Sequence, residues 1–186
     1  MTTLLAANGS HASDIIEIAN RAGLYYMAQY DDATNPAPDN FIGDIIIGIN
    51  DPIKRREIAE RYPFAPGAHS LVDPSAVIGN DVVMARGVVI GPLANVSHGV
   101  TLGTHVHVNS HASLVRCGVG PYTTVSPGAT VCGDVSIGEA CTIGAGSVIA
   151  DRCTIGHEVT IGAGAIVPPC SIVPDGSKVI GVWRKP

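Results

Sequence analysis

The sequence is poor in aromatic residues and in basic clusters, and it has no long apolar run. Aromatics make up 4% of the 186 residues, and Lys and Arg total 11 against a net charge of −5. Nucleic-acid and membrane-surface binding therefore lack their usual basic footprint. The N-terminus has no basic segment ahead of an apolar run, and no apolar run reaches about 18 residues. We expect a cytoplasmic protein with no membrane or nucleic-acid partner.

Paired cysteine motifs are also missing. The five cysteines are odd in number and show no CxxC spacing: Cys117, Cys132, Cys141, Cys153 and Cys170. A disulfide framework or a cysteine-based metal site would need such pairing. We therefore expect reduced, packed thiols and no metal.

From Ile78 to Val173, an aliphatic residue recurs at a regular interval of six residues. The step is six everywhere except between Leu114 and Val119, where it is five. This period is the signature of a parallel β-helix. The members are Ile78, Met84, Ile90, Val96, Leu102, Val108, Leu114, Val119, Val125, Val131, Ile137, Ile143, Ile149, Ile155, Ile161, Val167 and Val173.

A second small or β-branched residue precedes most aliphatic positions by two, and Gly often follows them. Spacing of two puts both side chains on the inner face of a short strand, so Cys117, Cys141 and Cys153 fill small inward slots. We attribute the Gly to corners with positive φ. Three strands and three corners make an 18-residue coil, and flat faces of this kind favour a homotrimer.

The first 70 residues read as a small α/β unit. Apolar runs at 3–7, 24–30 and 42–49 predict strands, and helical spacing predicts a helix over 12–22. Asp51-Pro52 starts a second helix that runs to about Tyr62. The turn Gly9-Ser10-His11 offers N–H groups to a phosphate, with an ordinary βα turn and a surface histidine as the alternative.

Nearly the whole chain resembles the sugar O-acyltransferase/sialic acid O-acetyltransferase family, which includes UDP-4-amino-sugar N-acetyltransferases. The N-terminal resemblance rests on Gly9-Ser10-His11, Asp31-Asp32 and the segment 47–50. The C-terminal resemblance rests on segments 73–79, 125–133 and 174–182, Asn109 and the hexapeptides. It implies a Rossmann-like βαβ domain over 1–70 and a left-handed parallel β-helix of about six coils over 71–186.

The resemblance also implies two ligands. A UDP-linked sugar would be held with Ser10 and His11 near the phosphates and Asp31 and Asp32 near the uridine. Acetyl-CoA would lie in a groove between neighbouring β-helices, against residues such as Gly133 and Ala163. The family has Gly where Ala163 stands, and its usual ending is replaced here by Trp183-Arg184-Lys185-Pro186.

The catalytic base of the family is absent from its expected place. The family has a histidine and an acidic residue seven and eight positions after the asparagine that matches Asn109. Here those positions are Arg116 and Cys117, because the short step removes one residue from the corner after Leu114. Arg cannot act as a base. Val115 would sit in this corner where Gly or Asn is favoured at positive φ.

Three explanations stay open. The base has moved to His98, 18 residues before Arg116, with His111 a weaker substitute and an exposed corner histidine the plain alternative for His98. Arg116 instead anchors an anionic group while a neutral amine attacks unaided. Or the protein is a catalytically silent UDP-sugar/CoA-binding homologue.

A zinc-dependent, carbonic-anhydrase-like β-helix protein is a further alternative, since His98, His105, His107 and His111 cluster. It lacks the two histidines five residues apart that those enzymes use. The sequence favours an acetyl-CoA-dependent acyltransferase that acts on a nucleotide-linked amino sugar in bacterial glycan synthesis.

Overall fold

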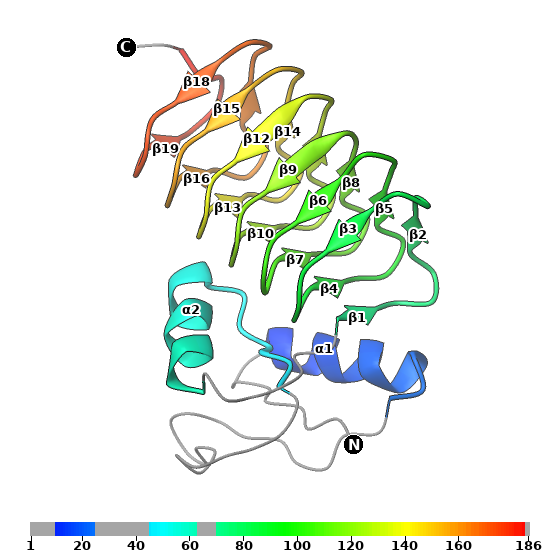
Figure 1. Ribbon diagram of the computed structural model, residues 1–186. Helices are drawn as coiled ribbons and strands as arrows, with labels where there is room; N and C mark the ends of the chain where they lie inside the picture. Colours follow the sequence, from blue (N-terminus) through cyan, green and yellow to red (C-terminus); the bar gives the residue numbers. More distant parts are fainter. Residues whose placement is uncertain (1–9, 25–44, 63–69, 185–186) are drawn as a thin grey trace.

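The computed structural model describes residues 10–24, 45–62 and 70–184: two helices followed by a parallel β-solenoid (Figure 1). The expected strand at 3–7, most of the one at 24–30, and the residues Asp31 and Asp32 lie outside the described ranges. Among the described residues, no helix is both long and apolar enough to cross a bilayer.

The solenoid has three sheets, each made of every third strand. Sheet I has the order β1-β4-β7-β10-β13-β16-β19, sheet II runs from β2 to β17, and sheet III from β3 to β18. The predicted parallel β-helix of about six coils is confirmed. The strands are β1 (Leu71–Val72), β2 (Val77–Ile78), β3 (Val83–Met84), β4 (Val89–Ile90), β5 (Asn95–Val96), β6 (Thr101–Leu102), β7 (His107–Val108), β8 (Ser113–Leu114), β9 (Cys117–Val119), β10 (Thr124–Val125), β11 (Thr130–Val131), β12 (Val135–Ile137), β13 (Thr142–Ile143), β14 (Val148–Ile149), β15 (Thr154–Ile155), β16 (Thr160–Ile161), β17 (Ile166–Val167), β18 (Ile172–Val173) and β19 (Lys178–Val179).

Strand register shows how the solenoid absorbs the missing residue. In most strand pairs the partners are 18 residues apart, as in Ile90↔Val108. Where a pair spans the short corner they are 17 apart, as in Leu114↔Val131. The spacing returns to 18 above it. The ladder stays in register throughout.

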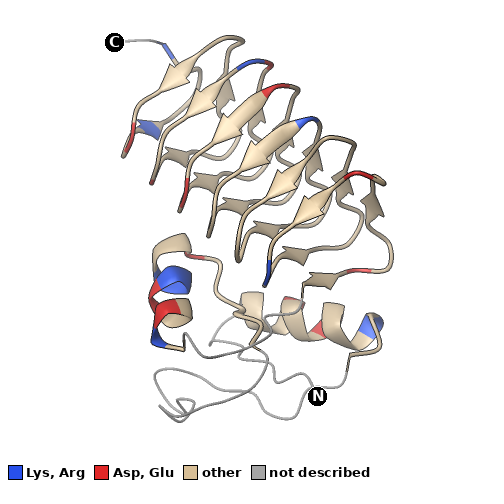
Figure 2. Cartoon of the chain, in the orientation of Figure 1, with Lys and Arg blue, Asp and Glu red and all other residues tan. Residues whose placement is uncertain are grey.

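The core follows the predicted inward pattern. The aliphatic positions from Ile90 to Val173 are buried, as are the small residues two before them as far as Ala165, and Cys117, Cys141 and Cys153 take small inward positions. Most charged residues of the solenoid lie at its corners, as Figure 2 shows. Burial raises the pKa of the Cys117 thiol to about 12.

The expected role of the corner glycines was wrong. Gly91, Gly103 and Gly120, each directly after an aliphatic residue, do not have positive φ. A Cβ on Gly103 would lie 2.6 Å from the backbone nitrogen of Pro121, and one on Gly120 would lie 2.6 Å from the backbone of Gly138. These glycines are needed because consecutive corners stack closely. Positive φ occurs two residues later, as at Leu93.

The N-terminal helices form where the sequence predicts them. Helix α1 spans Ser10–Arg21 and α2 spans Pro52–Arg61. The Asp51 carboxylate caps α2 by accepting from the N–H groups of Ile53 and Lys54 at 2.9 and 3.0 Å. In the described part of the expected strand at 42–49, only Ile47 makes a bridge.

Helix α1 packs on the outer face of sheet I. Ile15 and Ile18 join a buried cluster with Leu71 of β1 and Val89 of β4. Arg21 forms an ion pair with buried Asp73 at 3.1 Å. Outward residues of β7 and β10 are buried as well, whereas Thr160 of β16 is exposed. The N-terminal region therefore covers sheet I over the first coils only.

Candidate functional site

The corners stack into three edges, named here by the sheets that they join. His98, Arg116 and Gly133 lie on edge II–III, in three consecutive corners. Asn109 and Ala163 lie on edge I–II. Within one chain, the candidate catalytic and cofactor-binding residues thus fall on two different edges.

Arg116 makes the two backbone hydrogen bonds that two separate residues make in other corners. In an ordinary corner, the third residue after the aliphatic donates its N–H to the second residue of the corner before it, as Gly128 does to Ser110 at 3.0 Å. Arg116 donates in this way to the His98 carbonyl at 3.1 Å, and its own carbonyl accepts from Asp134 at 2.8 Å. The shortened corner therefore loses neither hydrogen bond.

The strain expected at Val115 lies at Arg116 instead. Arg116 has φ +40°, while Val115 is not in the positive-φ region and donates its N–H to Val131 as any first corner residue does. The deletion moves the left-handed position one residue closer to Leu114. The expectation for Val115 was wrong for this reason.

The Arg116 side chain extends over Gly133. A Cβ on Gly133 would overlap the guanidinium, with Cζ 3.1 Å away. The guanidinium Nε lies 3.7 Å from an Asp134 carboxylate oxygen, and the Asp151 carboxylate accepts from the Gly133 N–H at 3.0 Å. Arg116 is about half exposed, so this ion pair stabilises little.

His98 is exposed on the same edge, one coil before Arg116. Its Nδ1 lies 3.3 Å from the Ser97 hydroxyl. The stacking of the two corners, inferred from the 18-residue spacing, is present. The residue that packs against Arg116 is Gly99, since a Cβ there would lie 3.4 Å from Cγ of Arg116.

On edge I–II, the Asn109 amide donates to the Val125 carbonyl at 3.1 Å. His111, in the same corner, is exposed and has φ +60°. Neither is brought to Arg116 within the chain. Ala163 is exposed two coils beyond Val125.

Ser10 is the first residue of α1, and His11 follows it at the junction with the solenoid. His11 Nε2 lies 3.1 Å from Nδ1 of His107, which is buried on the outer face of β7. Asp14 lies 3.7 Å from the other ring nitrogen of His11. Burial lowers the pKa of His11, against the opposing effect of Asp14.

Two further histidines belong to this junction. Burial lowers the pKa of His105 to about 4 and that of His107 well below its usual value, and Arg55 adds to both shifts. His105 stacks on Tyr122 with centroids 5.7 Å apart. His105 Nδ1 is buried without a hydrogen-bond partner among the described residues.

The histidines within the described residues do not form a metal-binding group. Over residues 10–24, 45–62 and 70–184, no three His, Cys, Asp or Glu side chains are placed to hold a metal ion. The zinc alternative therefore has no ligand set in this part of the chain.

Sequence reasoning missed Arg55, and it considered His107 only as a possible zinc ligand; both residues join the N-terminal region to the solenoid. One signal was present for each. Arg55 stands between Pro52 and Ile58 at three-residue spacing, on the buried face of α2. His107 follows Leu71 and Val89 in the outward column of sheet I, and two apolar residues facing outward indicate a covered face.

Comparison with known proteins agrees with this architecture. Residues 116–151 match the bacterial transferase hexapeptide (six repeats). No curated protein matches the sequence.

Several solved structures share the fold over almost their full length. The acetyltransferase domain of PglB from Neisseria gonorrhoeae, in complex with acetyl coenzyme A, is 25% identical, with 96% of each chain covered and a TM-score of 0.81. WeeI from Acinetobacter baumannii is 20% identical over 97% of each chain, with a TM-score of 0.80. A mutant GDP-perosamine N-acetyltransferase from Caulobacter crescentus, with CoA and GDP-perosamine, is 21% identical, covers 97% of this chain and 94% of its own, and has a TM-score of 0.66. The repeat at 116–151 and the fold over almost the whole chain make this protein similar to hexapeptide-repeat acetyltransferases.

Proposed function

We propose that this protein is an acetyl-CoA-dependent N-acetyltransferase that acts on a nucleotide-linked amino sugar in glycan biosynthesis. The observation that carries the proposal is the match to the acetyl-CoA-bound PglB domain over 96% of both chains. The match includes the N-terminal region, not only the repeats that many acyltransferases share.

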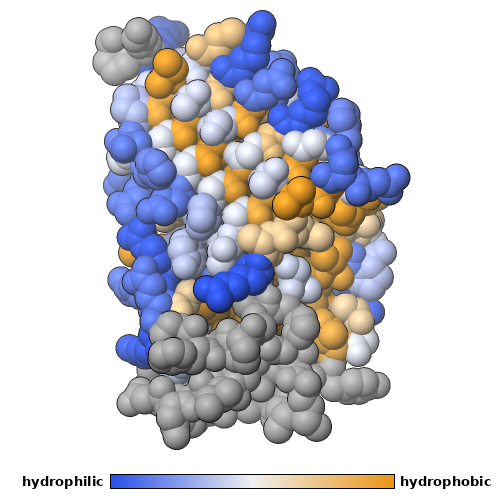
Figure 3. All heavy atoms as spheres, in the orientation of Figure 1, coloured by the Kyte–Doolittle hydropathy of each residue, from blue (hydrophilic) through white to orange (hydrophobic). Residues whose placement is uncertain are grey.

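The placement of the site residues supports an oligomeric enzyme. Gly133 and Ala163 lie on different edges, so a groove containing both needs edge II–III of one copy beside edge I–II of another. Sheet II also leaves apolar side chains exposed on its outer face, with Val77 at 64% and Ile166 at 43%. Figure 3 shows rows of hydrophobic and weakly polar side chains on the solenoid surface. We infer a homotrimer with acetyl-CoA between neighbouring copies.

The reaction would proceed by direct attack of the sugar amine on the thioester carbonyl. A bond forms between nitrogen and the acetyl carbon, the carbon–sulfur bond breaks, and the amine proton must leave. The Gly133 N–H, which donates to the Asp151 carboxylate in this structure, would have to leave that carboxylate to stabilise the oxyanion. His98 is our candidate base, because it is exposed on edge II–III beside the Arg116 corner.

Transfer can be tested with purified protein, acetyl-CoA and a panel of UDP- and GDP-linked amino sugars. Release of free CoA that depends on one of these sugars, with an acetylated product in mass spectra, is expected. Absence of release with every sugar, despite binding of both ligands, would instead support the silent homologue.

The silent homologue is favoured by one observation. At the corner where the family has its base, this chain has Arg116, paired with Asp134 and lying over Gly133. Such a protein would bind nucleotide sugar and CoA without turnover. Thermal-shift responses to UDP and CoA are expected for both candidates and so test binding alone.

A further inference from the structure

Arg55 of α2 is a completely buried arginine. It shares the buried face of the helix with Pro52 and Ile58. Burial lowers the pKa of Arg55 to about 9, so the guanidinium stays protonated at neutral pH. A buried cation of this kind costs free energy unless its donors are satisfied.

The guanidinium donates to two consecutive coils of the solenoid. Its Nε donates to the His105 carbonyl at 2.9 Å, and Nη2 donates to the Thr124 hydroxyl at 2.9 Å and to the Tyr122 carbonyl. His105 and Tyr122 are the left-handed residues of stacked corners on edge III–I. Arg55 therefore bridges these two corners.

The same side chain also holds the segment that enters α2. Nη1 donates to the Ile49 carbonyl at 2.5 Å and lies 3.3 Å from the Asn50 carbonyl. The Thr124 hydroxyl donates to the Asn50 carbonyl at 2.7 Å. Helix α2, segment 49–50 and strand β10 are thus joined through one planar group.

All the acceptors of Arg55 in the described part of the chain are neutral carbonyls or a hydroxyl. Charge pairing is therefore not what selects an arginine here. The feature that favours an arginine is its rigid fork of five donors, because a lysine ammonium could not reach acceptors on three segments.

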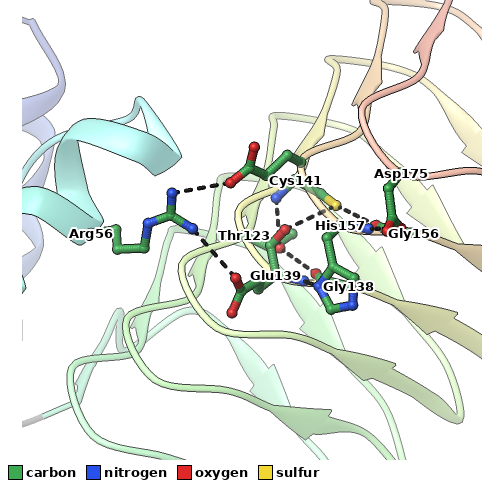
Figure 4. Close-up of polar contacts among 9 residues, drawn as sticks. Arg56, Thr123, Gly138, Glu139, Cys141, Gly156, His157 and Asp175 are labelled. Carbon is green, nitrogen blue, oxygen red and sulfur yellow. Dashed lines mark hydrogen bonds and ion pairs between the residues drawn. The ribbon is translucent and has the colours of Figure 1, made fainter.

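The next residue provides a natural contrast. Arg56 reaches out to Glu139 at 3.4 Å and Glu158 at 3.0 Å, as Figure 4 shows. It also joins α2 to edge III–I, but through partly exposed ion pairs, which contribute little. Arg55 therefore makes a buried junction between α2 and the solenoid, and Arg56, on the same helix, makes a partly exposed one.

We propose that Arg55 is a positioning residue, which fixes the N-terminal region in one placement on sheet I and so sets where a nucleotide sugar bound there presents its amine. The role rests on the proposed function. It assigns to Arg55 no contact with either substrate. Loss of the Arg55 side chain should misplace the sugar amine relative to the acetyl thioester, without weakening the binding of acetyl-CoA.

The full-length protein carrying Arg55→Met or Arg55→Lys tests this role against Arg56→Met. Both Arg55 variants should exchange backbone amide hydrogens in residues 45–62 at least about 100-fold faster, with the solenoid strands unchanged. Turnover number should fall at least about 10-fold in both, while the KM for acetyl-CoA stays the same. Arg56→Met should behave as the unmodified protein.

Three results would overturn the proposal. One is full activity and normal exchange in Arg55→Met. Another is equal loss of protection in the solenoid strands, which would make Arg55 a general stability residue. A third is rescue of both readouts by Arg55→Lys, which would make charge, not the fork, the requirement. If the unmodified protein transfers no acetyl group, the proposed function fails, and the exchange contrast between the Arg55 and Arg56 variants still decides whether Arg55 fixes the placement.

Discussion

The backbone N–H of Arg116 donates to the carbonyl of His98 across one coil, at 3.1 Å. This bond places the candidate base one corner before Arg116. Their proximity makes His98 the first residue to test.

Replacement of His98 by Ala should lower the turnover number by about 100-fold or more if His98 removes the amine proton. Steady-state kinetics with acetyl-CoA and the best sugar substrate will measure it. His157→Ala is a suitable control, since His157 is an exposed corner histidine on edge III–I. Unchanged turnover in His98→Ala would exclude His98 as the base.

Gly120→Ala should destabilise the solenoid because the new Cβ would meet the backbone of Gly138 at 2.6 Å. A loss of about 1–3 kcal/mol is expected from such overpacking. Gly118→Ala is the matched control, because a Cβ there meets nothing within 4 Å. Urea unfolding of both variants measures the difference, and equal stability would show that the corners can separate to admit a methyl group.

Acid should weaken the folded state through His105. Its pKa is about 4 when folded, below the ordinary 6.5, so the unfolded chain takes up the proton first as pH falls. Stability is then retained above about pH 6.5 and lost progressively between 6.5 and 4, with about 2 kcal/mol lost at pH 5 from this group. Arg55 and Arg86 oppose its protonation, and His11 and His107 shift in the same direction.

Urea unfolding at pH 7.5 and pH 5 tests this dependence. His105→Gln should reduce the loss of stability between pH 7.5 and pH 5 without abolishing it, because His11 and His107 still shift in the same direction. A protein equally stable at both pH values would contradict the assignment.

Thiol labelling should distinguish the cysteines by burial. Cys170 is exposed and should react promptly with a thiol reagent at pH 7.5, while Cys117, Cys141 and Cys153 should stay protected. Burial raises the pKa of each of these three thiols, which favours the unreactive protonated form. Mass spectrometry after brief labelling identifies the sites, with urea-unfolded protein as the control for all five.

The solenoid could be predicted from the sequence because its core has one repeating environment. The six-residue repeat and the small inward positions both reflect side chains that face a narrow apolar interior. The five-residue step is one shorter interval within that repeat. The role of Gly91, Gly103 and Gly120 could not be read in this way. It depends on the distance between successive corners, which no local pattern encodes.

The junction of α2 with the solenoid was harder to predict for a related reason. In the solenoid, Arg55 contacts residues 50 to 69 positions away in the chain, and apart from the Thr124 hydroxyl its described acceptors are backbone carbonyls. A carbonyl has no sequence signature. The location of strain at Arg116 rather than Val115 similarly depends on which residue completes the ladder to His98, and a count from one flank cannot settle it.

The double hydrogen bonding of Arg116 has a consequence for how such proteins change over time. A residue can be removed from a corner while the strands on both sides keep their partners, because a neighbour takes over the vacated bonds. The five-residue step after Leu114 is therefore accommodated without loss of the backbone ladder. A solenoid of this kind can change which side chain projects from a corner by changing the length of that corner, because the strands on both sides keep their partners.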